Sequence, residues 1–279
     1  MSELADFLRA RREHLTPADV GLPDSGRRRT PGLRREEVAA LAGVSIDYLI
    51  RLEQGRDSNP SPSVLAAIAR ALRMSEDERT HLVRLAHIAQ TPELCPEFRP
   101  ARTVEPTVHL LLDRLDPTPA FVIGPFFDVL AWNDAWERLM APVGMFDGPD
   151  EQPNLARFTF LHPNARVAYP EWSATADEQA SVLRVQALPY GEDVRFRALL
   201  DDLQGAPGFA ERWAAHSVVQ KRRGTKRIAH PVGEVRVAYE VLPLPDGDGA
   251  SLITWLPADE AADDLLRRAV QPAAGLRAV

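Results

Sequence analysis

The sequence has very little cysteine, very little lysine and no long apolar run. Cys95 is the single cysteine among 279 residues, so a disulfide within the chain is impossible and a zinc site made of several cysteines is excluded. No apolar stretch approaches the roughly 20 residues that a membrane-spanning helix needs. Charged and apolar residues alternate over 1–15, which is not the pattern of a signal peptide. These absences predict a protein of the reducing cytoplasm.

The charge is acidic overall but basic in one segment. The formal net charge is −7, and two lysines accompany 31 arginines, a bias that we attribute to a GC-rich, bacterial genome. Residues 1–90 contain 14 arginines and 13 acidic residues, whereas the remainder contains 19 basic and 27 acidic residues. Within 27–56, seven arginines stand against four acidic residues. Such a local concentration of positive charge is what a DNA footprint requires.

The length predicts two domains. Helical periodicity in the first 90 residues predicts five helices, at about 2–15, 34–42, 45–54, 62–72 and 75–89. Ser75 and Glu78 form a capping box, and Pro62 suits a first helical position. Four prolines in residues 91–106 predict a linker. The second domain is then expected over 107–270, followed by a flexible tail at 271–279.

The second domain shows a mixed pattern. Alternating residues predict strands at 120–124, 127–132, 234–242 and 251–256, with a DGDG turn before the last. Helices are expected at 171–187, 194–203 and 208–216. We therefore expect a mainly α protein, with a five-helix first domain and an α+β second domain made of an antiparallel sheet with inserted helices.

The strongest pattern lies in residues 34–56. Ala39 is small where two steeply crossing helices touch, and Gly43 tolerates the positive φ of a short turn. Ser45 can cap the second helix. The inward spacing is filled by Val38, Ala42, Val44, Leu49 and Leu52. The outward positions are Ser45, Ile46, Asp47, Tyr48, Arg51 and Gln54.

This segment resembles the xenobiotic-response-element class of helix-turn-helix regulators, in which the second helix of the pair enters the major groove of DNA. The resemblance covers residues 2–90 and implies base-reading roles for Ile46, Asp47 and Arg51, with Ser45 beside them. It implies a phosphate contact for Arg35, whereas Arg34 departs from the usual Ser or Thr cap. The remaining DNA-contact candidates are Arg28, Tyr48 and Arg56. The alternative is a helical bundle whose arginines are only solvated, or in which Ile46 packs on a neighbouring helix.

A second resemblance begins at the stretch FDVLAWNDAW and continues through NLARFTF, EWSATADEQASVLR and FAERWAAHSV to KRIAHPVGEVRVAYEVL. These stretches resemble the MmyB-like ligand-binding domain over roughly 107–257. The family implies a PAS-like fold, with helices over one face of the sheet, that holds a fatty acid or a similar apolar molecule. The implied ligand contacts are Trp132, Asn133, Arg157, Phe158, Trp172, Arg184, Trp213 and His216. The alternative is that the aromatics are plain core and that the two arginines pair with carboxylates of the domain.

These observations together predict a DNA-binding transcription regulator that is not an enzyme and holds no metal. The sequence contains no Walker loop, no Gly-x-Ser-x-Gly and no His-Glu-x-x-His. We expect a homodimer that binds a DNA operator and a small apolar ligand, with no membrane partner and no cofactor other than that ligand. Two alternatives give the second domain another role, either as a ligand-free dimerisation or protein-interaction module or as an enzyme.

Overall fold

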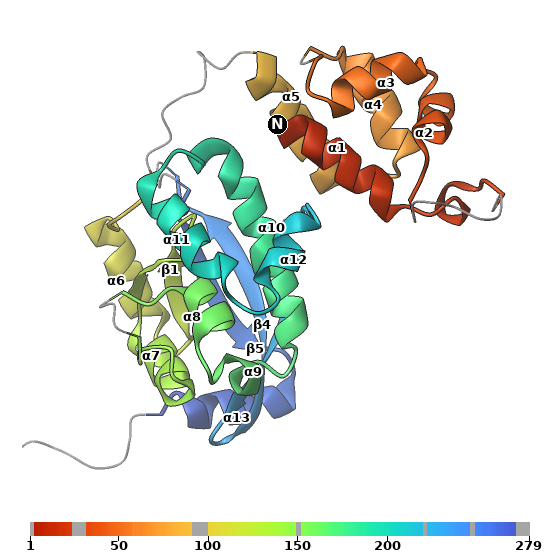
Figure 1. Cartoon of the computed structure of the whole chain (residues 1–279). Helices are drawn as coiled ribbons and strands as arrows, with labels where there is room; N and C mark the ends of the chain where they lie inside the picture. Colours follow the sequence, from red (N-terminus) through yellow and green to blue (C-terminus); the bar gives the residue numbers. More distant parts are fainter. Residues whose placement is uncertain are drawn as a thin grey trace, which may run out of the picture. The chain divides into compact units, whose positions relative to one another are not determined.

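The computed structural model describes residues 3–23, 32–57, 59–90, 100–148, 152–219, 222–245 and 249–271 (Figure 1). The chain divides into two compact units. One comprises residues 1–97 together with 211–220, and the other comprises 98–210 together with 221–279. The expected α and α+β architecture is confirmed, because the first unit is helical and the second is built on an antiparallel sheet.

The first unit contains the five predicted helices, each within two residues of its expected bounds. They are α1 (Glu3–His14), α2 (Arg35–Ala42), α3 (Ile46–Glu53), α4 (Pro62–Ala71) and α5 (Glu76–Gln90). The caps fix where the helices begin. Ser61, the residue before Pro62, caps α4, because its Oγ accepts a hydrogen bond from the amide of Val64. At the start of α5, the capping box joins Ser75 and Glu78 through hydrogen bonds of 2.8 and 3.3 Å.

The apolar faces of these helices form one core. Its largest buried side chains include Phe7, Leu8, Leu33, Leu49, Leu52 and Ile68. His81 on α5 also lies inside, with its ring edge-on to that of Phe7 at 5.1 Å. Burial of these side chains supplies the main stabilisation of the unit.

A buried carboxylate joins three of these helices. Glu53, at the end of α3, is 1% exposed. Arg12 of α1 donates to it from Nε at 2.7 Å and from Nη2 at 3.3 Å, and Arg35 of α2 donates from Nε at 2.7 Å. Arg12 also donates to the carbonyl of Leu33, and Arg9 donates to the carbonyl of Glu53. The network therefore fixes α1, α2 and α3 relative to one another.

The second unit contains a five-stranded antiparallel sheet in the order β2-β1-β5-β4-β3. The strands are β1 (Ala120–Ile123), β2 (Val129–Trp132), β3 (Arg223–His230), β4 (Gly233–Pro243) and β5 (Ser251–Pro257). Alternation along the sequence predicts one face of β4 with Val235, Val237, Tyr239 and Val241; the first three are buried, and Val241 is partly buried against the same core. Strand β3 was not expected. Its sequence RGTKRIAH has a single buried side chain, Ile228, so alternation cannot reveal it.

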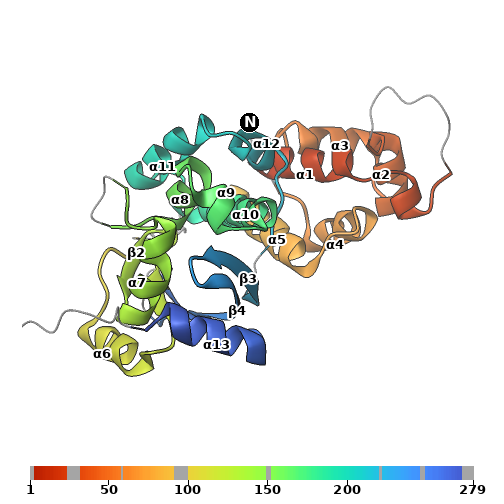
Figure 2. The ribbon, with the colours of Figure 1, turned by 90° about the horizontal axis from the view of Figure 1, so that it is seen from below.

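Helices cover parts of both faces of this sheet, which corrects the expected arrangement over one face. The helices are α6 (Pro106–Leu115), α7 (Asp134–Met140), α8 (Leu155–Leu161), α9 (Ala165–Ala168), α10 (Trp172–Tyr190), α11 (Val194–Gln204), α12 (Phe209–Ala214) and α13 (Glu260–Ala269). On one face, Trp136, Phe158 and Leu266 join the main core. On the other, Leu112 of α6 packs with Val122 and Ala131. Figure 2 shows α8, α9 and α10 next to one another.

The expected linker, 91–106, extends one residue too far, because helix α6 already begins at Pro106. Pro106 is the first residue of this helix, the position where a proline fits best because its missing N–H would have no helical partner. Residues 91–99 of the expected linker, most of the expected tail and three residues of the DGDG turn lie outside the described residues. The strands β4 and β5 on either side of that turn pair as predicted.

We expect Glu53→Gln to lower the free energy of unfolding of the first unit by about 3–5 kcal/mol. Loss of the charge leaves the Arg12 guanidinium, which is also buried, without the carboxylate that both its Nε and its Nη2 contact; the carboxylate that remains, that of Glu13, is half-exposed and contacts Nη2 at 3.2 Å. Chemical denaturation followed by circular dichroism measures the change. Glu36→Gln, at an exposed position of α2, is the control. Equal stability of the two variants would show that the buried network does not hold the helices.

Candidate nucleic-acid interface and ligand pocket

The turn between α2 and α3 has the predicted geometry. Gly43 has φ +66°, and no atom lies within 4 Å of the place where a Cβ would stand, so the backbone angle alone favours glycine. The amide of Val44 donates to the carbonyl of Ala39 at 3.1 Å and closes the turn. Ser45 Oγ then accepts from the amide of Tyr48 at 3.2 Å, which begins α3. The two helices form a helix-turn-helix.

The outer face of α3 is open to solvent. Ser45, Asp47 and Arg51 are exposed and Ile46 is 43% exposed, whereas Leu49 and Leu52 are buried. Ile46 therefore lies outside the buried core of the unit. The inward and outward sets of this helix are as the spacing predicts. Its polar outer side chains stand together on one surface of the unit.

Two side chains of this face contact each other. The guanidinium carbon of Arg51 lies 5.5 Å from the centroid of the Tyr48 ring, a cation–π distance. Partial burial raises the pKa of Tyr48, so its hydroxyl keeps its proton at neutral pH and can donate a hydrogen bond. Arg51 has no ion-pair partner among the described residues. Its donors are therefore available to a nucleic acid.

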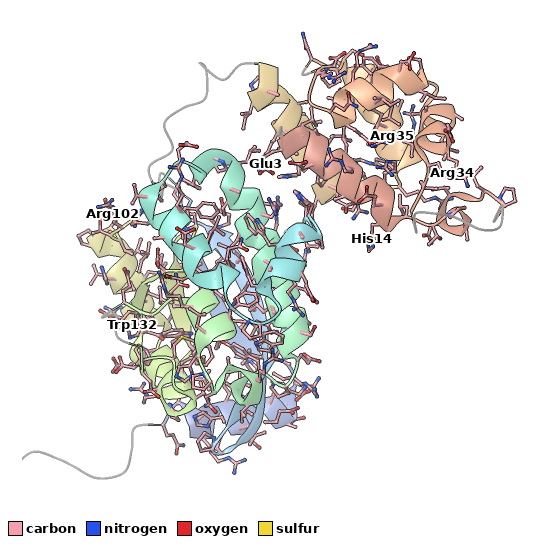
Figure 3. The ribbon with its side chains drawn as sticks, in the orientation of Figure 1. Glu3, His14, Arg34, Arg35, Arg102 and Trp132 are labelled. Carbon is pink, nitrogen blue, oxygen red and sulfur yellow. The ribbon has the colours of Figure 1, made fainter. Side chains whose placement is uncertain are left out.

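The arginines that flank α3 differ in their environment. Arg34 and Arg35, both labelled in Figure 3, are the N-cap and the first residue of α2. Arg35 contacts Glu53 through Nε while its side chain stays 46% exposed. Arg34 makes no side-chain cap, in line with its departure from the family pattern, although its amide donates to Glu37 at 2.7 Å. Arg56 is exposed. Arg28 lies outside the described residues.

Asn133, a predicted ligand contact, has a structural role instead. It is 3% exposed and caps α7. Its Oδ1 accepts from the amides of Ala120 and Trp136, and its Nδ2 donates to the carbonyls of Leu112 and Thr118. All hydrogen-bonding positions of the amide are therefore used within the protein. We remove Asn133 from the candidate ligand contacts.

The other polar candidates are also engaged within the protein. Arg157 pairs with Asp202 of α11, which agrees with the alternative that this arginine pairs with a carboxylate of the domain. Trp132 Nε1 donates to Glu137 at 3.0 Å, and Trp172 Nε1 donates to the carbonyl of Thr159 at 2.8 Å. Arg184 is 6% exposed on α10. These side chains consolidate the unit, whatever else they contact.

The second unit contains a cavity of about 480 Å³, a volume within the usual range of small-molecule sites. Its lining is Gly144, Met145, Asp147, Gly148, Gln152, Pro153, Asn154, Arg157, Phe158, Leu161, His162, Pro163 and Asp202. Of the eight predicted ligand contacts, Arg157 and Phe158 line it. Trp213 and His216, in the segment 211–220 that groups with the first unit, are not among its lining residues.

The sequence did not reveal most of this lining. Residues 144–148 and 152–154 are loop positions without periodicity, and tertiary folding brings them beside α8. The proline and glycine content of these loops marks turns but gives no sign of a cavity. Within the described part of the chain, no cluster of three or more His, Cys, Asp or Glu side chains is placed to hold a metal ion.

A helix-turn-helix with an open recognition face, joined to a sheet domain with a small-molecule cavity, defines a transcription regulator with a DNA-binding and a ligand-binding domain. Profile comparison agrees. Residues 3–82 match the helix-turn-helix domain, and residues 104–269 match the MmyB-like transcription regulator ligand binding domain. The chain therefore belongs to the MmyB-like family, and the resemblances seen in the sequence are confirmed. Both matched families are regulatory rather than enzymatic.

No curated protein matches the chain. In the described ranges, the helices are all too short or too polar to cross a membrane.

Proposed function

We propose that this protein is a one-component transcriptional switch of the bacterial cytoplasm. A homodimer binds a roughly palindromic operator through α3, and the second unit binds a small apolar molecule, with a fatty acid as the reference case. The observation that carries the proposal is that one chain has both an exposed recognition face on α3 and a cavity in the ligand-binding unit. In such dimers the half-sites lie about one helical turn apart.

Each residue of the α3 face has a chemical role in this proposal. Arg51 can donate two bonds to a guanine, Asp47 can accept from a cytosine amino group, and Ile46 can contact a thymine methyl group. The guanidinium of Arg35 retains donors for a phosphate, because only its Nε contacts Glu53. Base contacts provide sequence preference, and phosphate contacts position the helix.

A second candidate function gives the ligand-binding unit a filled core and a role in dimerisation or protein interaction alone. The observation that favours it is the burial of large aromatics in the core of this unit, where Trp136 is 0% exposed and Trp255 is 3% exposed. This candidate gives no role to the cavity beside α8. The two candidates differ in whether an extracted ligand changes DNA affinity.

We expect Arg51→Ala to relax base preference at one position of the operator, with a cost of about 1–3 kcal/mol on the cognate base. Selection from random duplexes followed by affinity measurements on single-base variants tests this. Arg84→Ala, at an exposed position of α5 outside the helix-turn-helix, serves as the control. If the wild-type protein enriches no motif at all, sequence-specific binding is refuted.

We expect Arg35→Ala to weaken binding to all duplexes by a similar factor, because a phosphate contact carries no base information. The slope of log affinity against log salt should become shallower by nearly one unit. Fluorescence anisotropy titrations over a range of salt concentrations measure the slope, and circular dichroism checks that the variant keeps its helical content. An unchanged slope would remove Arg35 from the interface.

We expect protein purified under gentle conditions to carry a small apolar molecule that native mass spectrometry detects. Removing it should change operator affinity, and operator DNA should change ligand affinity by the same factor, because linkage between two sites is reciprocal. A ligand-free protein whose operator affinity is insensitive to added cell lipid would favour the interaction-module candidate.

A further inference from the structure

The cavity of the second unit has an apolar side formed largely by α8. Phe158 and Leu161 stand one helical turn apart and both line it, together with Met145 and two prolines, Pro153 and Pro163. Phe158 and Met145 are 5% and 4% exposed, whereas Leu161 is 46% exposed. The Phe158 ring is held by stacking on His162 at 5.0 Å and by the edge of Tyr169 at 5.6 Å. A short alkyl chain on this wall would cover the exposed part of Leu161.

A polar corner lies in the same cavity at Gly144. This glycine has φ +97°, and a Cβ on it would lie 3.1 Å from Asp147 Oδ2, 3.4 Å from His162 Nε2 and 2.7 Å from His162 Cε1. The carboxylate and the imidazole thus both lie against the Gly144 backbone, where a Cβ would crowd them, and all three residues line the cavity. In the described part of the chain, no side chain or amide is hydrogen-bonded to the Asp147 carboxylate.

The hydrogen bond on the far side of the His162 ring determines what this corner offers. Nδ1 accepts from the amide of Asn164 at 3.3 Å, so a neutral imidazole carries its proton on Nε2. The corner therefore presents one donor, His162 Nε2–H, and one charged acceptor, Asp147. A hydroxyl group matches both, because its oxygen accepts from Nε2 while its proton is donated to the carboxylate.

The charges of the lining disfavour an anionic head group. Arg157 is the one arginine or lysine among the lining residues, and it is already paired with Asp202, which also lines the cavity. Asp147 then leaves the lining with an excess negative charge. The polar groups that remain do not compensate: Asn154 Nδ2 donates to the Phe126 carbonyl and to Asp128, and Gln152 donates to the Val129 carbonyl. A carboxylate at the corner would meet Asp147 as a like charge.

We propose that this cavity binds an uncharged amphiphile, with an alkyl body on Phe158 and Leu161 and a hydroxyl head between Asp147 and His162, in preference to a fatty-acid anion. This inference rests on the proposed ligand-binding function and specifies the head group of the ligand. Phe158 and Leu161 give affinity for the chain, and the Gly144 corner selects the head.

The test compares 1-octanol with octanoate, which is ionised at pH 7.5, on the full-length protein by isothermal titration calorimetry. Octanol should bind about tenfold more tightly than octanoate. Asp147→Asn keeps a hydrogen-bond acceptor but removes the charge, so octanoate should gain and the ratio should fall to about threefold or less. His162→Phe keeps the ring that stacks on Phe158 but removes the donor, so octanol should lose about fivefold. Asp201→Asn, an exposed neighbour of Asp202 that does not line the cavity, should change neither affinity.

Tighter binding of octanoate, an unchanged ratio in Asp147→Asn, or binding of neither probe overturns the inference. None of these results refutes the ligand-regulated switch, which is judged by the effect of the co-purified molecule on operator affinity. Conversely, octanol binding with the expected variant pattern and no effect of any ligand on DNA supports the head-group assignment and refutes the switch.

Discussion

The buried carboxylate of Glu53 sets the geometry of the DNA-binding unit. A charge that is 1% exposed is costly to desolvate, and the cost is offset only where well-placed cations and hydrogen bonds surround it. Arg12 and Arg35 meet this condition from two different helices. Because Glu53 is the last residue of α3, its partners fix the end of that helix against α1 and α2. The direction in which Arg51 points follows from this arrangement.

Arg35 shows how the same network connects stability with recognition. One donor, Nε, is held by Glu53 at 2.7 Å, which orients the guanidinium, and the side chain is still 46% exposed. An arginine ordered in this way loses less conformational freedom when it contacts a phosphate. The rigidity also restricts regulation. Rearranging α3 inside its unit would break buried ion pairs, so a ligand is expected to act on the spacing of the two DNA-binding units in the proposed dimer.

The sequence predicted the features that local chemistry determines. Ser45, Gly43 and the inward spacing of Leu49 and Leu52 are short-range patterns, and the helices they predict were found within two residues. Features that depend on tertiary contacts were missed. The family resemblance implied Asn133 as a ligand contact, but its partners at 112, 118 and 120 come together only in the folded unit. The cavity lining is likewise drawn from loops without periodicity.

Asn154 connects the ligand cavity with the frame of the sheet domain. Its Oδ1 caps α8 by accepting from the amides of Ala156 and Arg157, and its Nδ2 donates to the Phe126 carbonyl and to Asp128 in the turn between β1 and β2. The position of Phe158 is therefore tied to the sheet at one end of α8. On another side, Arg157 ties the helix to α11 through Asp202. A molecule in the cavity would press on α8, and the Arg157 ion pair, which is partly exposed and so weaker than the buried cap, is the link that can yield. Movement of α11 relative to the sheet is thus the first conformational change that ligand binding should produce.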